Sequence, residues 1–265
     1  MPINILVTAK QVLDPETPAG ALKIDNDAKR MEAPGNVPPV VNGYDENAVE
    51  AALKIKEAVG GTVTVLSAGS GFVMDVIKKT LSMGSDELIL VDDPSIIGLD
   101  AYGTAQVLSA AIKKAGDFDL ILCGRQASDY DQATVPLGVA EILDIPPVTM
   151  AMGLTVNDSS ASVARVMDDG NETVEVSLPA LVTVSNEIGQ PRYPNLRGIM
   201  AASKKQPTVW SLSDLGLDEN AVQAKVEIKE IFVPVTETEC EYIDGDDDEE
   251  KGRNLALKLR EAKII

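Results

Sequence analysis

Short apolar runs that alternate with helical patterns are the feature that most limits how this chain can fold. The runs have strand length, are rich in Val, Ile and Leu, and cover residues 3–9, 62–69, 87–93 and 119–125. Between them, apolar side chains recur at helical spacing in residues 46–59, 72–84 and 101–116. Continuous apolar character is typical of strands buried on both faces of a parallel sheet. Because right-handed crossovers join this order into such a sheet, the sequence predicts a doubly wound α/β fold.

The pattern changes after about residue 150 and becomes rich in alternating, strand-like segments. Residues 162–179 alternate on both sides of the Asp169-Gly170-Asn171 turn, which predicts a β-hairpin extension. Residues 179–187 could return to the main sheet, and residues 190–206 form a polar, proline-punctuated loop that leads into a short basic helix. We therefore expect one domain over residues 1–225.

We expect residues 226–265 to form a C-terminal arm. A strand-like segment at 226–235 precedes an acidic run at 244–250. We interpret this run as a solvated linker rather than a metal site, because like charges repel and nothing fixes a coordination geometry. A final helix over residues 254–265 carries apolar side chains that need a surface to cover, and beyond a linker that surface can belong to another chain.

Charge and residue content exclude several classes of function. A net charge of -19 argues against a nucleic-acid binder, which needs clustered Lys and Arg. The absence of histidine excludes a Ser-His-Asp triad, a His-based metal site and a His general base. Cys123 and Cys240 show no CxxC spacing, and the chain shows neither a signal-peptide pattern nor an apolar run near the roughly 20 residues of a membrane span. We therefore expect a soluble, cytoplasmic protein.

Three predicted strand ends carry the residues most able to bind a ligand. They are Ala9-Lys10, residues 67–71 (SAGSG) and residues 124–127 (GRQA). The carboxyl ends of parallel strands meet at the edge where ligands of α/β proteins bind. The SAGSG segment could present backbone N–H groups to an anion, or it could be a glycine-rich turn required by geometry alone. The dinucleotide pattern GxGxxG and the P-loop pattern are both absent from the sequence.

The segment that follows the last of these strands contains two acidic residues. Proline is tolerated in the first helical turn, so Pro136 predicts a helix that begins near residues 132–134. Asp129 and Asp131 then precede free backbone N–H groups, and both could simply cap the helix. Alternatively, one caps while the other meets a ribose hydroxyl or adenine amino group, which leaves the N–H groups of residues 132–135 for phosphate.

Several segments together resemble the small (beta) subunit of the electron transfer flavoproteins. In chain order over roughly residues 1–218, they are AKQVLD, NGYDENAVEAALKIKE, AGSG before TLSMGSDELILV, GRQASDYD, and LPALVTVSNEIGQPRYPNLRGIMAASKK. The resemblance implies an adenine-nucleotide-binding α/β fold. It also implies a heterodimer with a large (alpha) subunit that holds the electron-carrying FAD. It implies no catalytic residue and no metal in this chain.

The resemblance also implies the site residues. Beta subunits of this family hold AMP in ordinary members, and a second FAD in members that bifurcate electrons from NADH. The positions that match this nucleotide site are Ala9, Asn42, Ala68, Gly124, Arg125, Gln126, Asp129, Asp131 and Thr134. Asn42 could instead be an N-cap for the helix near Asp45. The loop at 190–206 matches the family's recognition loop for a flavin-containing dehydrogenase, with Leu196 as its apolar anchor between Tyr193 and Arg197.

The sequence departs from the family at the phosphate end of this site. Bifurcating relatives read DGDTAQVGP where this chain reads DYDQATVPL, so Tyr130, Thr134 and Pro136 replace a glycine, a glutamine and a glycine. Both nucleotides therefore remain open: FAD with bifurcation, or AMP in a simple electron shuttle. An alternative from another class is a stand-alone adenine-nucleotide sensor of the universal-stress type, a homodimer without flavin. An NAD-dependent dehydrogenase is disfavoured by the missing GxGxxG pattern and the absence of histidine.

Overall fold

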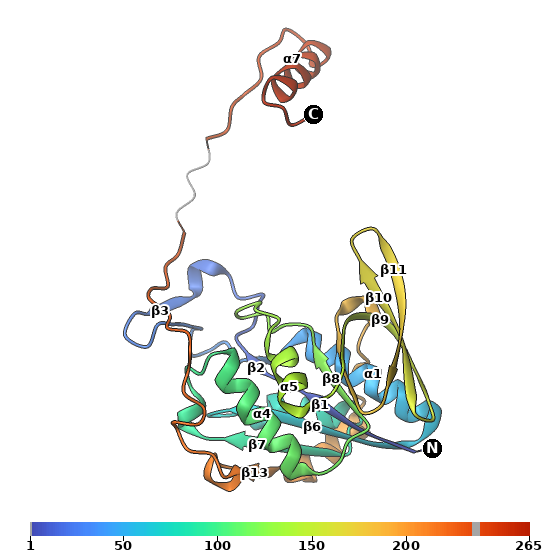
Figure 1. Cartoon of the computed structure of the whole chain (residues 1–265). Helices are drawn as coiled ribbons and strands as arrows, with labels where there is room; N and C mark the ends of the chain where they lie inside the picture. Colours follow the sequence, from blue (N-terminus) through green and yellow to red (C-terminus); the bar gives the residue numbers. More distant parts are fainter. Residues whose placement is uncertain (1, 235–238) are drawn as a thin grey trace. The chain divides into compact units, whose positions relative to one another are not determined.

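The computed structural model describes residues 2–234 and 239–265, and the chain divides into two compact units, Met1–Lys229 and Glu230–Ile265 (Figure 1). Within the described part of the first unit, nine strands form one sheet in the order β11-β10-β9-β12-β8-β1-β6-β7-β13. Their bounds are β1 Ile3–Thr8, β6 Gly61–Gly69, β7 Glu87–Asp92, β8 Leu120–Gly124, β9 Pro147–Asn157, β10 Ser160–Met167, β11 Gly170–Ser177, β12 Ala180–Val184 and β13 Thr208–Trp210. Pairing is parallel from β13 through to β9 and antiparallel from β9 to β11.

Helices cover both faces of this sheet. The helices are α1 Gly43–Val59, α2 Met74–Ile77, α3 Lys79–Met83, α4 Ala101–Ala115, α5 Val135–Leu143 and α6 Leu196–Lys204. Along β1, Ile5 and Val7 belong to the hydrophobic core that includes residues of α1, α3 and α6, whereas Leu6 belongs to the core that includes residues of α4 and α5. This alternation is the period-two pattern of a strand buried on both faces. The doubly wound α/β prediction is therefore confirmed.

Smaller elements complete the first unit. Two short antiparallel pairs lie in the connection between β1 and α1: β2 Gln11–Val12 with β5 Val40–Val41, and β3 Lys23–Asp25 with β4 Arg30–Glu32. Among the residues that the structure describes, four 3₁₀ helices span Ala19–Ala21, Pro94–Ile96, Asn186–Ile188 and Ser213–Leu215. The predicted hairpin is confirmed as β10 and β11, which extend well beyond the neighbouring strands in Figure 1. The predicted return of the chain to the main sheet is confirmed as β12, which lies between β8 and β9.

Three predicted elements differ in the structure. The helix expected at residues 72–84 is two short helices, α2 and α3, joined at Lys78. The helix expected to begin near residues 132–134 begins at Val135. The strand-like segment at 226–235 forms no strand over its described residues, 226–234, and residue 235 lies outside them. Its apolar side chains lack a neighbouring strand, and alternation alone does not make a strand without a pairing partner.

The second unit contains the helix α7 Asp248–Glu261, which begins earlier than the sequence predicted. The side chain of Asp247 accepts a hydrogen bond from the Glu250 backbone N–H (2.8 Å), and three acidic residues fill the first turn. Negative charge is stabilised there by the positive end of the helix dipole. Residues 247–250 of the acidic run thus form the N-cap and the first turn of α7. The interpretation of the whole run, 244–250, as a linker was wrong.

A buried carboxylate ties the start of α1 to two strand ends. Asp45 is 6% exposed, and its side chain accepts hydrogen bonds from the backbone N–H groups of Lys10 (2.8 Å) and Gly124 (3.1 Å). Lys10 follows β1 and Gly124 ends β8. A Cβ atom at position 124 would lie 2.3 Å from Asp45 Oδ1, so the close contact between Asp45 and this strand end requires glycine. Burial raises the pKa of Asp45 to about 7, although its backbone hydrogen bonds oppose this rise.

We predict that Asp45 makes stability fall as the pH rises towards neutrality. Its pKa in the folded protein, about 7, exceeds its ordinary value of 3.8, so the folded state holds a proton that the unfolded state has lost. The free energy of unfolding should fall by up to about 1.4 kcal/mol per pH unit between about pH 4 and 7, then level off. Urea denaturation of the wild type and of Asp45→Asn at each pH measures the difference. A difference that is constant with pH would contradict the shifted pKa.

Candidate functional site

Three of the predicted strand ends lie side by side. Because β1 lies between β8 and β6, Ala9, Ala68 and Gly124 come together at the carboxyl edge of the sheet. The Ala9 N–H donates to the Leu66 carbonyl (2.9 Å), which continues the β1–β6 pairing past the end of the strand. The chain leaves β1 towards β6 on one side, whereas β8 lies on the other side. This is the topological switch point at which ligands of open α/β sheets bind.

Asn42 supports the loop that follows β8. It occupies the N-cap position of α1, but its side chain makes no hydrogen bond to the helix N–H groups within the described chain. Its Nδ2 instead donates to the Gln126 carbonyl (2.8 Å), and its Oδ1 accepts from the Ser128 N–H (3.2 Å). Asn42 is only 1% exposed, so these two bonds fix residues 126–128 from the buried side of the loop. Asn42 therefore occupies the predicted N-cap position, but its side chain binds the backbone of the loop and not that of the helix.

The two aspartates of this loop do not cap α5. Asp129 Oδ2 pairs with Lys10 Nζ (2.6 Å), and Asp131 Oδ1 accepts from Gln126 Nε2 (2.7 Å). Thr134 is the exposed N-cap residue, and no side-chain capping bond is present there among the described residues. The capping prediction was wrong because the backbone enters the helix through left-handed conformations at Asp131 (φ 50°) and Ala133 (φ 55°). As a result, the carboxylates of Asp129 and Asp131 bind side chains outside the helix and not the N–H groups of its first turn.

Several buried polar atoms at this edge have no hydrogen-bond partner among the described residues. They are Arg125 Nε, Ser128 Oγ and Asp129 Oδ1 in the loop, and Ser67 Oγ in β6. A buried polar group without a partner costs roughly 1–3 kcal/mol, so a concentration of such atoms at a strand edge indicates a place where a ligand completes the bonding. An acceptor, Asp129 Oδ1, and a cationic donor, Arg125 Nε, lie in the same loop, four residues apart in sequence.

Two cations and two aromatic rings flank this loop. The Arg125 guanidinium lies 5.2 Å from the centre of the Tyr44 ring, and Lys10 Nζ lies 5.6 Å from the centre of the Tyr130 ring. Tyr130 is 48% exposed and the Lys10 side chain is 45% exposed, so both remain accessible from solvent. Tyr44 and Asp45 were not among the predicted site residues, whereas Lys10 belongs to the first of the three predicted strand ends. The position of Lys10 directly after the first strand is the signal that singled it out.

The predicted recognition loop ends in an exposed apolar surface. Tyr193 is 95% exposed and Leu196, the first residue of α6, is 74% exposed, with Arg197 also exposed beside them. Ile199 and Met200, which were not among the predicted recognition residues, are 49% and 57% exposed on the same helix. Exposed apolar side chains in sequence on one short helix are typical of a binding surface, whereas single ones are ordinary.

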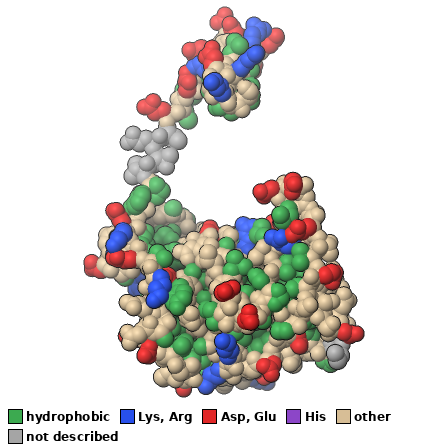
Figure 2. All heavy atoms as spheres, viewed as in Figure 1, with side chains coloured by type: hydrophobic (Ala, Val, Ile, Leu, Met, Phe, Trp, Pro, Cys, Tyr) green, Lys and Arg blue, Asp and Glu red, His purple; other side chains and the backbone are tan. Residues whose placement is uncertain are grey.

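Apolar surface is exposed elsewhere as well. The face of the molecule in Figure 2 shows hydrophobic side chains between scattered acidic and basic groups. In the second unit, no side chain of α7 is buried within the described residues, and Leu255, Leu257, Ile264 and Ile265 are all at least 45% exposed. Within the described residues, the leucines of this largely charged helix are therefore not covered by a hydrophobic core of the second unit. Among the described residues, no helix has the length and apolar character needed to cross a bilayer.

Known proteins match the chain over nearly its whole length. A family model described as the electron transfer flavoprotein domain matches residues 35–215. The chain is 38% identical to the electron transfer flavoprotein subunit beta of Thermoanaerobacterium thermosaccharolyticum and 38% identical to the caffeyl-CoA reductase-Etf complex subunit CarD of Acetobacterium woodii. It is 33% identical to the electron transfer flavoprotein subunit beta of Bacillus subtilis. Each alignment covers 99% of this chain and 100% of the relative. The chain therefore belongs to the electron transfer flavoprotein family, as a beta subunit.

Proposed function

We propose that this chain binds an adenine nucleotide at the carboxyl edge of β1, β6 and β8 and works in a heterodimer with an alpha subunit that carries FAD. The observation that supports this most is the set of buried, unpartnered polar atoms on Arg125, Ser128 and Asp129. A stand-alone sensor is not favoured, because the family of the chain and the full-length matches are those of electron transfer proteins.

The residues present fit the adenylate that AMP and FAD share. Asp129 Oδ1 is an acceptor suited to a ribose hydroxyl or an adenine amino group, and Arg125 Nε is a cationic donor suited to phosphate. The small residues Ala9, Ala68 and Gly124 leave the three strand ends open to close approach. Of the other predicted positions, Asn42 binds the Gln126 carbonyl, and the side chains of Gln126 and Asp131 pair with each other. Thr134 is exposed at the N-cap of α5.

The identity of the nucleotide decides the function of this subunit. When bound, FAD supplies one- and two-electron redox chemistry, whereas AMP supplies none. With FAD, we propose that the heterodimer bifurcates electrons from NADH. With AMP, it is a simple electron shuttle. In either case this chain's own residues bind and orient the adenylate: Lys10 neutralises Asp129, and the Tyr130 ring lies beside Lys10. The cytoplasm remains the predicted compartment.

We also propose that the loop at residues 190–206 docks a flavin-containing dehydrogenase. Leu196 and Tyr193 offer an apolar anchor, and Arg197 a charged rim, which together are the features of an interface hot spot. The Acetobacterium relative is by its name a subunit of a complex with a caffeyl-CoA reductase, and this supports a docked partner enzyme. We also propose that α7, in the arm at residues 226–265, packs on the alpha subunit, because burying its exposed leucines against a partner would remove apolar surface from water.

We predict that Asp129→Ala weakens nucleotide retention by about tenfold, since a hydrogen bond to a charged group contributes roughly 1.5–3 kcal/mol. The purified heterodimer is denatured, and the FAD and AMP released per complex are counted by chromatography. Two FAD and no AMP in the wild type would establish a bifurcating carrier, and one of each a shuttle. Asp168→Ala, the same change in the hairpin turn between β10 and β11, is the matched control. Full occupancy in Asp129→Ala would remove this carboxylate from the site.

Leu196→Ala should lower electron transfer from the dehydrogenase at least tenfold, because truncating a buried anchor of an interface costs 2 kcal/mol or more. The flavin spectrum of the heterodimer should not change, since Leu196 is exposed and distant in sequence from the nucleotide loop. Stopped-flow flavin reduction measures the transfer rate. Ile97→Ala, which truncates another exposed apolar residue, provides the control. Unchanged transfer by the Leu196 variant would exclude the docking role.

Deleting residues 248–265 should loosen the heterodimer, because it removes the apolar face of α7 from the proposed interface. Sedimentation or size-exclusion measurements over a dilution series give the dissociation constant. Replacing Leu255 and Leu259, which lie one helical turn apart on the same face, with Ser tests this face without shortening the chain. Equal dissociation constants for the wild type and both variants would show that the helix does not pack on the alpha subunit.

A further inference from the structure

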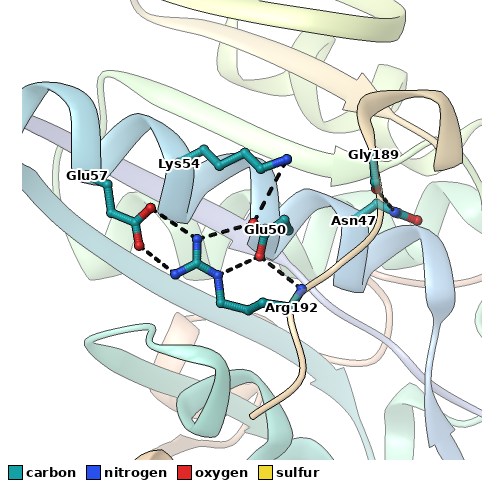
Figure 3. Close-up of polar contacts among 6 residues, drawn as sticks. All are labelled: Asn47, Glu50, Lys54, Glu57, Gly189 and Arg192. Atoms are coloured by element: carbon teal, nitrogen blue, oxygen red, sulfur yellow. Dashed lines mark hydrogen bonds and ion pairs between the residues drawn. The ribbon is translucent and has the colours of Figure 1, made fainter. Parts of the chain in front are cut away.

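One face of α1 holds the base of the recognition loop. Asn47, Glu50, Lys54 and Glu57 follow each other at intervals of three or four residues, so they line a single stripe along the helix (Figure 3). Two residues contact this stripe: Gly189, directly before the loop, and Arg192, three residues later within it. The loop is therefore attached to a helix whose own position is set by the strand ends.

Arg192 bridges the two carboxylates of the stripe. Its Nε donates to Glu50 Oε2 (2.7 Å) and its Nη2 to Glu50 Oε1 (3.2 Å). On the other side, Nη1 and Nη2 both donate to Glu57, the latter over 3.1 Å. Figure 3 shows the guanidinium plane lying between the two carboxylates. Every guanidinium nitrogen has a carboxylate partner. Because the guanidinium is planar, these bonds fix the orientation of the Arg192 side chain.

The main chain of Arg192 is fixed by the same carboxylate. Its backbone N–H donates to Glu50 Oε2 (3.1 Å), so one side chain holds both the backbone and the guanidinium. The Glu50 side chain is 7% exposed, and a carboxylate removed from water needs such donors. The hydrogen bond from Arg192 lowers the pKa of Glu57 below its ordinary value, so that this partner is ionised at neutral pH.

A second attachment lies three residues earlier. Asn47, 5% exposed, donates from Nδ2 to the Gly189 carbonyl (2.7 Å). Gly189 has a φ of 115°, and a Cβ there would lie 3.3 Å from Lys54 Nζ, so the position favours glycine. Both ends of the segment 189–192 are thus fixed on α1, and Tyr193 and Leu196 directly after it are exposed to solvent.

We infer that Arg192 is a positioning residue for partner recognition: it holds the loop in the conformation that presents Tyr193 and Leu196. This inference rests on the docking role proposed above. Its own nitrogens are occupied by Glu50 and Glu57, so it acts through the loop and not by contact with the partner. A loop already ordered before docking loses less conformational freedom on binding, and this raises affinity without any added contact.

The test uses the complete heterodimer and its dehydrogenase. Arg192→Gln should raise the KM for the dehydrogenase by about tenfold with kcat nearly unchanged, because ordering the loop is then left to the binding step. Arg192→Lys keeps the charge but cannot bridge two carboxylates, so it should restore part of the loss. Glu57→Gln should shift KM in the same direction by less. Arg30→Gln, the same change in the exposed Arg30–Glu32 ion pair of β4, is the matched control and should leave KM unchanged.

Hydrogen exchange at residues 193–196 gives the second readout, and Arg192→Gln should increase the exchange rate there. An unchanged KM in Arg192→Gln, with Leu196→Ala impaired, would overturn the positioning role and leave the docking proposal standing. A fall in kcat that follows the loss of folded heterodimer, with KM unchanged, would assign Arg192 to stability and also overturn the inference. Unimpaired Leu196→Ala would overturn the docking role, and the positioning role with it.

Discussion

The N-terminus of α1 and the buried carboxylate of Asp45 are the constraint on which the ligand edge of the sheet depends. Asp45 accepts the N–H groups of Lys10 and Gly124, which follow or end two neighbouring strands. Separating the strand ends would leave a buried carboxylate and two backbone donors unpaired, at a cost of several kcal/mol. The edge is therefore held open and rigid before any ligand arrives, with no side chain at Gly124 to fill it.

The same helix supports both proposed binding surfaces. At its N-cap, Asn42 holds the loop that carries Asp129, and along its length the stripe from Asn47 to Glu57 holds the loop that carries Leu196. From the start of α1 to Glu57 is about 21 Å at 1.5 Å per residue. One rigid helix thus gives a nucleotide loop and a docking loop a common frame, although the two loops are separate in sequence.

Pairing of charges explains how a chain of net charge -19 builds these sites. Two cations of these sites pair with carboxylates of the same chain: Lys10 with Asp129, and Arg192 with Glu50 and Glu57. At contact distance such pairs are screened little, whereas the repulsion between scattered surface charges falls off over about 8 Å at physiological ionic strength. The overall acidity therefore says little about the local potential at the strand edge.

The sequence by itself determined the sheet, because buried parallel strands require continuous apolar runs, and it placed Ala9, Ala68 and Gly124 together, because parallel strand ends share an edge. It did not determine which partners the polar side chains take. The aspartates that capping rules assigned to α5 bind Lys10 and Gln126 instead, and Arg192 reaches carboxylates more than 130 residues earlier in the chain. Local patterns report backbone periodicity and the nearest N–H groups. Long-range ion pairs depend on which loops the folded sheet brings next to α1, and only the tertiary structure decided that.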